Sequence, residues 1–183
     1  SCYLAFVAKN KLIYLMCIED HSGLKFAQFV GNKKLATATR KAFEKVLARM
    51  PMEPARVRVD KGMEFAGLKA LLAAKNIKFT QLDTFQKSYN AENFIGQARR
   101  VFRRYKTRSG RKDIRPMMQN IVQSLNRKHS RILGMSPNEA SKIANAGLIF
   151  ERRFASYLRN RLLQKKAPRY SIGQRVRVIA FRN

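Results

Sequence analysis

The chain has 183 residues, of which 45% are hydrophobic, and this suits one domain with a buried core and a short appendage. Its charge is unusual, because 39 Lys and Arg residues against 11 Asp and Glu residues give a net charge of +28. Such an excess repels itself unless an anionic partner neutralises it, and nucleic acid is the polymer that fits best. The basic residues are spread along the whole chain and no run reaches transmembrane length, which disfavours a membrane partner.

The two cysteines, Cys2 and Cys17, both lie in apolar, strand-like runs. Neither the spacing nor the His partners of a zinc site are present. We therefore expect both thiols to be buried and reduced, in agreement with an intracellular compartment. The chain begins at Ser1 rather than Met, which is consistent with an upstream part, such as a targeting segment, that is missing or removed.

The first third of the chain predicts three strands and a helix. Apolar runs at residues 2–7 and 12–18 predict a hairpin of buried strands, and residues 24–30 predict a third strand after a turn. Residues 34–49 have helical spacing, and the proline-containing run that follows ends this helix.

The central stretch predicts two further strands and a long helix. Residues 57–60 predict a buried strand that ends on Asp60, Gly62 supplies the turn after it, and residues 77–82 predict the next strand. The apolar face of the helix that follows is formed by Ala91, Phe94, Ile95, Ala98, Val101, Phe102 and Tyr105. Asp60 at a strand end and Glu92 at a helix start could together hold Mg²⁺, which prefers oxygen ligands. Taken alone, Asp60 is more simply a polar strand end that caps the next turn.

Basic residues cluster in and beyond this helix. No acid occurs between Glu92 and Asp113, so the cations there have no acidic neighbour in the sequence to pair with. Such a run is the pattern expected where a protein contacts phosphates, and the planar fork of Arg suits phosphate oxygens. The residues predicted to bind nucleic acid are Lys87, Arg99, Arg100, Arg103, Arg104, Lys106, Arg108, Arg111, Lys112, Arg152, Arg153, Arg175 and Arg177.

The last part of the chain predicts helices and then a strand. Residues 118–125 have one apolar helix face, and Ser136 with Glu139 has the pattern of a capping box at a helix start. Residues 148–166 predict a basic helix. Its inward face is predicted to be formed by Phe150, Phe154, Tyr157, Leu158 and Leu162, and its other faces by Arg152, Arg153, Arg159 and Arg161. The alternation at residues 175–178 predicts a strand.

Three motifs follow one another along the chain. They are D-K-G-M-E-F at residues 60–65, K-S-Y-N-A-E-N-F at residues 87–94, and an ordered Asn, His, Gly-apolar pair and Pro within residues 126–140. Together they resemble the retroviral-type integrases of the RNase H-like fold, in particular those of Maverick/Polinton DNA transposons. The first motif matches that family's D-x-G-x-E-F fully. The second matches the family's K-x-x-x-x-E-R-F-N-R at Lys87, Glu92 and Phe94 but lacks its Arg, Asn and Arg.

The resemblance implies an α/β architecture of the RNase H-like kind, with a mixed five-stranded sheet flanked by helices over residues 1–147. Residues 148–183 would then hold the C-terminal basic helix and the start of a short β tail. This tail, residues 167–182, resembles the K-F-x-x-G-D-x-V-R segment that opens the family's SH3-like barrel, with Gln174 in place of its Asp.

The resemblance also implies a site. Asp60 and Glu92 match two metal ligands of the family's catalytic centre, but Tyr3 stands where the family's first catalytic Asp is expected. A Tyr is neutral near pH 7, and losing the acid that two metals share should cripple a two-metal reaction. Glu19 or Asp20 is the alternative source of a replacement acid.

Three functions fit these observations. We favour a nucleic-acid-binding structural protein that derives from an integrase, is catalytically inactive and lies in a ribonucleoprotein such as a mitochondrial ribosome. Its partners would be RNA rather than DNA, together with other proteins of that assembly, and it would need no cofactor. The alternatives are an active Mg²⁺-dependent DNA strand transferase of a mobile element and a protein-interaction module in a larger assembly. The expected location is intracellular, either mitochondrial or nuclear.

Overall fold

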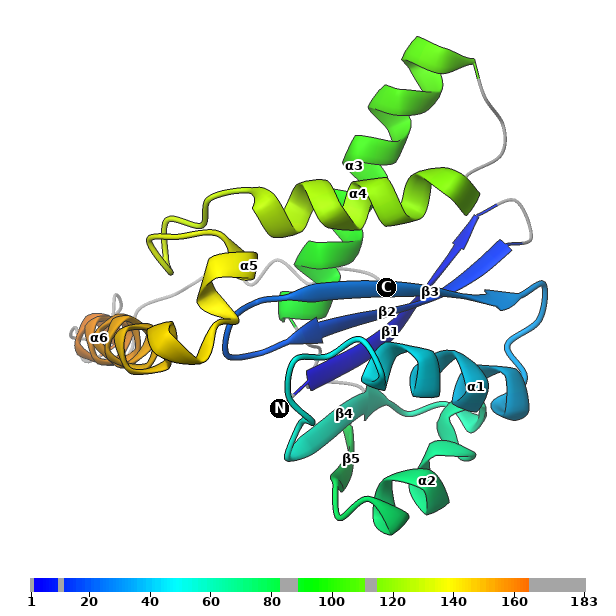
Figure 1. Ribbon diagram of the computed structural model, residues 1–183, viewed down its shortest axis with the longest axis horizontal. Helices are drawn as coiled ribbons and strands as arrows, with labels where there is room; N and C mark the ends of the chain where they lie inside the picture. Colours follow the sequence, from blue (N-terminus) through cyan, green and yellow to red (C-terminus); the bar gives the residue numbers. More distant parts are fainter. Residues whose placement is uncertain (1, 10–11, 83–88, 111–114, 165–183) are drawn as a thin grey trace, which may run out of the picture.

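The computed structural model describes residues 2–9, 12–82, 89–110 and 115–164 (Figure 1). The strands in this part of the chain are β1 (Cys2–Lys9), β2 (Leu12–Glu19), β3 (Lys25–Gly31), β4 (Arg56–Asp60) and β5 (Lys78–Leu82). The α-helices are α1 (Ala36–Leu47), α2 (Leu68–Ala74), α3 (Tyr89–Ser109), α4 (Arg115–Arg127), α5 (Pro137–Ala140) and α6 (Ala146–Gln164). Two short 3-10 helices are η1 (Met63–Phe65) and η2 (Ile143–Asn145). The predicted β tail lies outside the described residues.

The strands form one mixed five-stranded sheet, which confirms the prediction, and their order is β3-β2-β1-β4-β5. β1 and β2 are the predicted antiparallel hairpin, and β2 pairs with β3 in the same sense. β4 runs parallel to both β1 and β5. Leu4 of β1 pairs with Cys17 on one side and with Val59 on the other, so β1 lies in the middle of the sheet.

Helices cover both faces of the sheet, as the alternation of buried side chains requires. On one face α3 and α4 pack against β1 and β2, and Figure 1 shows these two helices together on one side of the sheet. On the other face α1, η1 and α2 pack against the same strands and β4. Cys2 and Cys17 are fully buried in this second layer as free thiols, which confirms the prediction. None of the described helices combines the length and apolarity needed to cross a bilayer.

Polar side chains of α4 bind the edge strand β3. The Asn126 side chain accepts from the backbone N–H of Lys25 at 3.0 Å and donates to its carbonyl at 2.8 Å. The Gln119 amide donates to the carbonyl of Ala27 at 3.0 Å. An edge strand presents unpaired backbone groups, and these contacts satisfy three of them. They explain Asn126, the first residue of the third motif, as a structural residue.

The predicted capping box begins α5. The Ser136 Oγ accepts from the backbone N–H of Glu139, and the Glu139 carboxylate accepts from the backbone N–H of Ser136 at 2.8 Å. The same carboxylate accepts from the Ser136 hydroxyl at 2.7 Å. These bonds satisfy orphan donors at the helix start, so the local sequence alone fixes this turn.

The predicted orientation of the last helix is wrong. Phe150, Phe154, Tyr157 and Leu158, expected to face inward, are exposed. α6 instead packs through the fully buried Ile149, which joins Leu133 and Ala140 in a small cluster of its own. The apolar stripe of a helix shows which residues share a face, but a neighbouring element must be present to cover that face. The Leu162 side chain lies outside the described residues.

Candidate functional site

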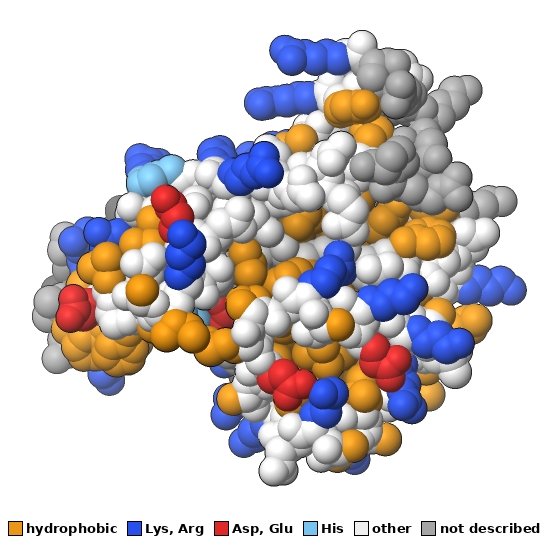
Figure 2. All heavy atoms as spheres, viewed as in Figure 1, with side chains coloured by type: hydrophobic (Ala, Val, Ile, Leu, Met, Phe, Trp, Pro, Cys, Tyr) orange, Lys and Arg blue, Asp and Glu red, His pale blue; other side chains and the backbone are white. Residues whose placement is uncertain are grey.

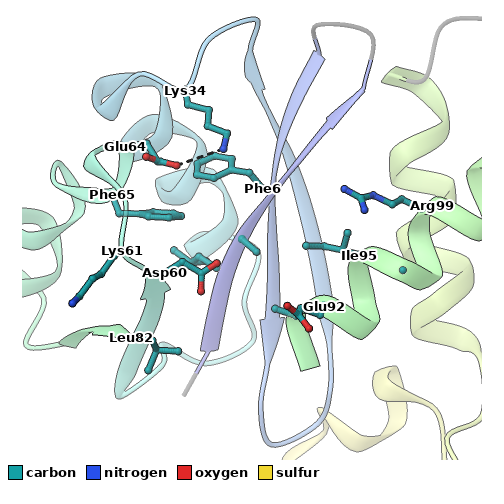
Figure 3. A pocket seen from close by; sticks show the side chains of 14 residues that line it. Phe6, Lys34, Asp60, Lys61, Glu64, Phe65, Leu82, Glu92, Ile95 and Arg99 are labelled. Atoms are coloured by element: carbon teal, nitrogen blue, oxygen red, sulfur yellow. Dashed lines mark ion pairs between the residues drawn. The ribbon is translucent and has the colours of Figure 1, made fainter. Parts of the chain in front are cut away.

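A cleft of about 600 Å³ opens where β4 ends and α3 begins (Figure 3). Its wall comes from β1, from the segment after β4 and from the first turns of α3. The charged side chains that line it are Lys34, Asp60, Lys61, Glu64, Glu92 and Arg99, and the apolar ones are Leu4, Ala5, Phe6, Phe65, Leu82, Ala91 and Ile95. The cleft therefore holds the two acids that the sequence singled out.

Asp60 and Glu92 enter this cleft from two different elements. Figure 3 shows Asp60 at the end of β4 and Glu92 on the first turn of α3. Both side chains are exposed to solvent. The start of a helix favours a carboxylate, because its free N–H groups and its dipole present positive charge there. The structure thus brings together the two predicted metal ligands.

The cleft also holds a third acid, Glu64, which the sequence analysis did not single out. Its carboxylate pairs with the Lys34 ammonium at 3.6 Å, marked by the dashed line in Figure 3. The Lys34 nitrogen also lies 5.0 Å from the centre of the Phe6 ring, and that ring stacks on Phe65 at 5.0 Å. Glu64 and Phe65 are the last two residues of the D-K-G-M-E-F motif, so the sequence could have identified them as cleft residues. No motif in the sequence points to Lys34.

Gly62 has a different role from the one predicted. Its backbone φ is −160°, which is extended and open to any residue, so the turn does not require glycine. A Cβ at this position would lie 2.6 Å from a Glu64 carboxylate oxygen. The missing side chain therefore lets the Glu64 carboxylate fold back over the backbone at the mouth of the cleft.

Tyr3, predicted to stand in the place of the first catalytic Asp, does not line the cleft, whereas Ala5 does. Tyr3 pairs with Arg58, two residues before Asp60, and its side chain is buried in the layer of α3 and α4. The parallel pairs run from Cys2 with Val57 to Leu4 with Val59, so Ala5 and Asp60 are the next residues of the two strands. Ala5 lines the cleft. The prediction for Tyr3 came from matching a few residues of the first strand, and the lining of the cleft favours Ala5 as the position of the absent acid.

Glu19 and Asp20 do not replace the missing acid. The Glu19 carboxylate accepts from the backbone N–H groups of His21 and Ser22 at 2.7 and 2.6 Å, so it caps the turn between β2 and β3. The Asp20 carboxylate lies 3.8 Å from the Arg58 guanidinium. Both acids line a second, smaller pocket near the end of α4, and neither lines the cleft that holds Asp60 and Glu92.

The cleft does not fit a two-metal centre. Within residues 2–9, 12–82, 89–110 and 115–164, no three His, Cys, Asp or Glu side chains are grouped so that they could share a metal ion. Glu64 is paired with Lys34, and the Lys61 and Arg99 cations line the same cleft. A second carboxylate-bound metal needs an acid that bridges the pair, and Ala5 supplies none. Asp60 and Glu92 are the two predicted ligands in this cleft, and their carboxylates have the oxygen atoms that a hydrated cation contacts.

The predicted cations of α3 lie on its solvent side. Arg99, Arg100, Arg103, Arg104 and Arg108 are all exposed, while the Phe94, Ala98 and Phe102 side chains of the same helix are buried. Figure 2 shows Lys and Arg side chains projecting from the free end of this helix, at the top of the view. Arg99 also lines the cleft, so the basic surface begins beside Glu92.

Two predicted nucleic-acid contacts have structural partners instead. The Arg153 guanidinium donates to the carbonyl of His21 at 2.7 Å, and burial lowers its pKa from the usual value. The Arg152 guanidinium donates to the carbonyl of Leu133. These contacts hold α6 on the body of the protein, so binding of nucleic acid by these two residues stays a prediction. Lys87, Arg111, Lys112, Arg175, Arg177 and the side chain of Lys106 lie outside the described residues.

No family model matches this chain in sequence, and no curated protein matches it. The fold, in contrast, is similar to solved integrase cores. The catalytic core domain of BIV integrase matches with a TM-score of 0.61 and 17% sequence identity over 85% of this chain and 97% of that domain. The HTLV-2 integrase catalytic core domain, solved in complex with magnesium in a trimeric form, matches with a TM-score of 0.63 and 14% identity over 77% of this chain and 95% of that domain.

These comparisons define the class to which the structure belongs. The described part of the chain has the RNase H-like fold of a retroviral integrase catalytic core. The motifs at residues 60–65 and 87–94 predicted this fold, and the prediction is confirmed.

Proposed function

We propose that this protein binds nucleic acid on an integrase-like core and does not catalyse strand transfer. The observation that carries the proposal is the set of exposed arginines on α3. Within the described part of the chain, Arg99, Arg100, Arg103 and Arg104 form no salt bridge, and the acid nearest to them on the helix is Glu92 at its start.

The spacing of these arginines opposes helix stability unless an anion is bound. Arg99 with Arg103, and Arg100 with Arg104, stand at i and i+4, where like charges destabilise a helix by about 0.2–0.5 kcal/mol per pair. A chain that keeps such pairs, with a net charge of +28, is suited to a polyanion. Phosphates along a nucleic acid would neutralise both cations of each pair.

The absence of catalysis is argued from Ala5. A carboxylate at this position would face the cleft beside Asp60, and Ala5 has none. The competing function, a Mg²⁺-dependent DNA strand transferase, is favoured by Asp60 and Glu92 in one cleft but lacks the third acid that a two-metal reaction needs. If that function held, Mg²⁺ would be its cofactor.

The nucleic acid that we propose is RNA, held in a large ribonucleoprotein with other proteins. A compact chain with cations over its whole length suits a protein surrounded by RNA. A mitochondrial ribosome is the assembly that we favour, and a nuclear assembly is the alternative. A module that serves only protein contacts would leave the unpaired arginines of α3 unexplained.

The test is a salt series with the purified full chain. Fluorescence anisotropy with a structured RNA and with a DNA duplex of matched length should show binding to both, tighter to RNA. The logarithm of the affinity should fall linearly with the logarithm of salt concentration, because bound cations are released from the phosphates. Absence of binding, or an affinity independent of salt, would contradict the proposal. Strand transfer with Mg²⁺ or Mn²⁺ that Asp60→Ala abolishes would contradict the claim of inactivity.

A further inference from the structure

An exposed row of aromatic rings lies on α6. Phe150, Phe154 and Tyr157 leave 65%, 51% and 54% of their surface exposed, and their i, i+4 and i+7 spacing places them on one face of the helix. Figure 2 shows hydrophobic side chains gathered at the left edge of the molecule, where Figure 1 places α6. Monomeric proteins rarely expose a contiguous patch of this kind unless it binds something.

Contacts made by the opposite side of α6 keep this aromatic row facing the solvent. Ile149 is fully buried against Leu133, and Arg152 and Arg153 donate to backbone carbonyls of the α4–α5 connection and of the β2–β3 turn. A rotation of α6 that hid the rings would break these contacts. The aromatic face is therefore a surface of the folded molecule.

The rings and their neighbours have the chemistry of a base-stacking platform. The Phe150 and Phe154 rings are nearly parallel, with an angle of 5° between their planes and 6.2 Å between their centres. The Arg161 guanidinium lies 5.8 Å from the centre of the Tyr157 ring, and its i+4 spacing from Tyr157 places it on the same face of the helix. Aromatic faces beside cations bind unpaired bases and their phosphates together.

We propose that the aromatic face of α6 binds single-stranded nucleic acid, with unpaired bases stacked on Phe150, Phe154 and Tyr157 and a phosphate on Arg161. This inference rests on the proposed function and extends it to a second surface with a different mode of recognition. A duplex hides the faces of its bases and would not use these rings. A second copy of this chain is disfavoured as the occupant, because each copy carries a charge of +28.

The chain contains no tryptophan, which gives a direct optical test. Phe154→Trp places a single indole on the aromatic face. Ile143→Trp places one at an exposed site in η2, outside that face, as the matched control. Titration with an oligouridylate of about 12 nucleotides should quench the indole at position 154 and leave the one at position 143 unchanged. Equal quenching at both positions, or none at position 154, would overturn the inference.

A second pair of variants separates stacking from apolar docking. The ring variant (Phe150→Leu, Phe154→Leu and Tyr157→Leu) keeps an apolar helix face but removes the π systems. We expect it to bind the oligouridylate about tenfold or more weakly, with the ratio to wild type unchanged by salt. The leucine variant (Leu148→Ala and Leu158→Ala) should bind as wild type does. An equal loss in both variants would mean that apolar contact with α6, rather than stacking on its rings, carries the binding, and this would overturn the inference.

The duplex probe distinguishes the inference from the proposed function. If the ring variant binds the oligouridylate and the DNA duplex as tightly as the wild-type protein does, α6 is not a stacking surface. The proposal that the arginines of α3 bind nucleic acid then stands. If the wild-type protein binds neither probe, both proposals fall. Circular dichroism should show the same helix content in every variant, since the substituted side chains are exposed.

Discussion

Ala5 of β1 and Asp60 of β4 directly follow the paired residues Leu4 and Val59 on neighbouring parallel strands, and both line the cleft that Glu92 also lines. This places an alanine where a third carboxylate would complete an acidic cluster. Asp60 and Glu92 line the cleft together with Glu64, which is paired with Lys34. The similarity to integrase cores is one of fold.

The first prediction restores the third acid. Ala5→Asp should raise the affinity for Mn²⁺ by about tenfold or more over wild type, because it adds a charged oxygen ligand to Asp60 and Glu92. Isothermal titration calorimetry measures this gain. Adding Asp60→Ala to that variant should remove the gain.

Tyr3→Asp is the matched control for this prediction. Its carboxylate would face the buried layer of α3 and α4 rather than the cleft, so it should lower stability without adding Mn²⁺ affinity. Gain of Mn²⁺ binding in Tyr3→Asp, and not in Ala5→Asp, would show that the register drawn between β1 and β4 is wrong.

The second prediction concerns the arginines of α3. Replacing Arg99, Arg100, Arg103 and Arg104 with Gln should weaken RNA binding and reduce the magnitude of the salt slope by up to about four. The same substitutions remove like-charge pairs, so the free energy of unfolding without RNA should rise by a few tenths of a kcal/mol, on the order of 0.5 in total. Anisotropy and urea denaturation measure the two effects.

A variant with the same charge change controls for net charge. Lys33, Lys41, Lys45 and Lys69 are exposed on or near α1 and α2, across the sheet from α3. Their replacement with Gln should change the salt slope much less than the α3 substitutions do. Equal effects of the two variants would mean that net charge, rather than the α3 surface, drives binding.

The third prediction concerns Gly134, in the connection between α4 and α5. Its φ is +66°, and a Cβ there would meet the Arg152 guanidinium that donates to the carbonyl of Leu133. Gly134→Ala should therefore lower the free energy of unfolding by about 1–2 kcal/mol. Gly96→Ala, in the middle of α3 with open space around it, should raise it by about 0.5–1 kcal/mol. A destabilisation of the same size in both variants would contradict this account of Gly134.

The fourth prediction is a pH dependence at α5. Hydrogen bonds from the Ser136 side chain and then from its backbone N–H lower the pKa of Glu139. A carboxyl whose pKa is lower in the folded state stabilises the protein above its unfolded pKa, and the stabilisation is lost as the pH falls through the folded value. Thermal melts of wild type and Glu139→Gln should differ at neutral pH and converge in acid. A difference for Glu139→Gln that stays constant with pH would contradict the capping role.

The sequence was sufficient for the fold where the signal was local. The apolar runs of β1 and β2, the period of 3.6 in α3 and the capping box at Ser136 each act within a few residues, and the structure has all of them. The motifs added the mixed five-stranded sheet. Asp60 and Glu92 were placed together for the same reason.

The remaining features depend on contacts between distant segments. Ala5 was missed because the register of β1 on β4 is set by packing across the sheet. Lys34 was missed because its partner Glu64 lies in another segment of the chain. The exposed face of α6 was predicted to be buried. Helical periodicity shows which apolar residues share a face, but it does not show whether another element packs against that face.

The most direct test of the central claim is to isolate the native protein gently and to sequence whatever nucleic acid remains bound. We expect one abundant structured RNA, recovered together with many partner proteins in a large particle. A protein that sediments as a small species free of RNA would contradict the claim, and heterogeneous DNA or the ends of a mobile element would favour an active integrase instead.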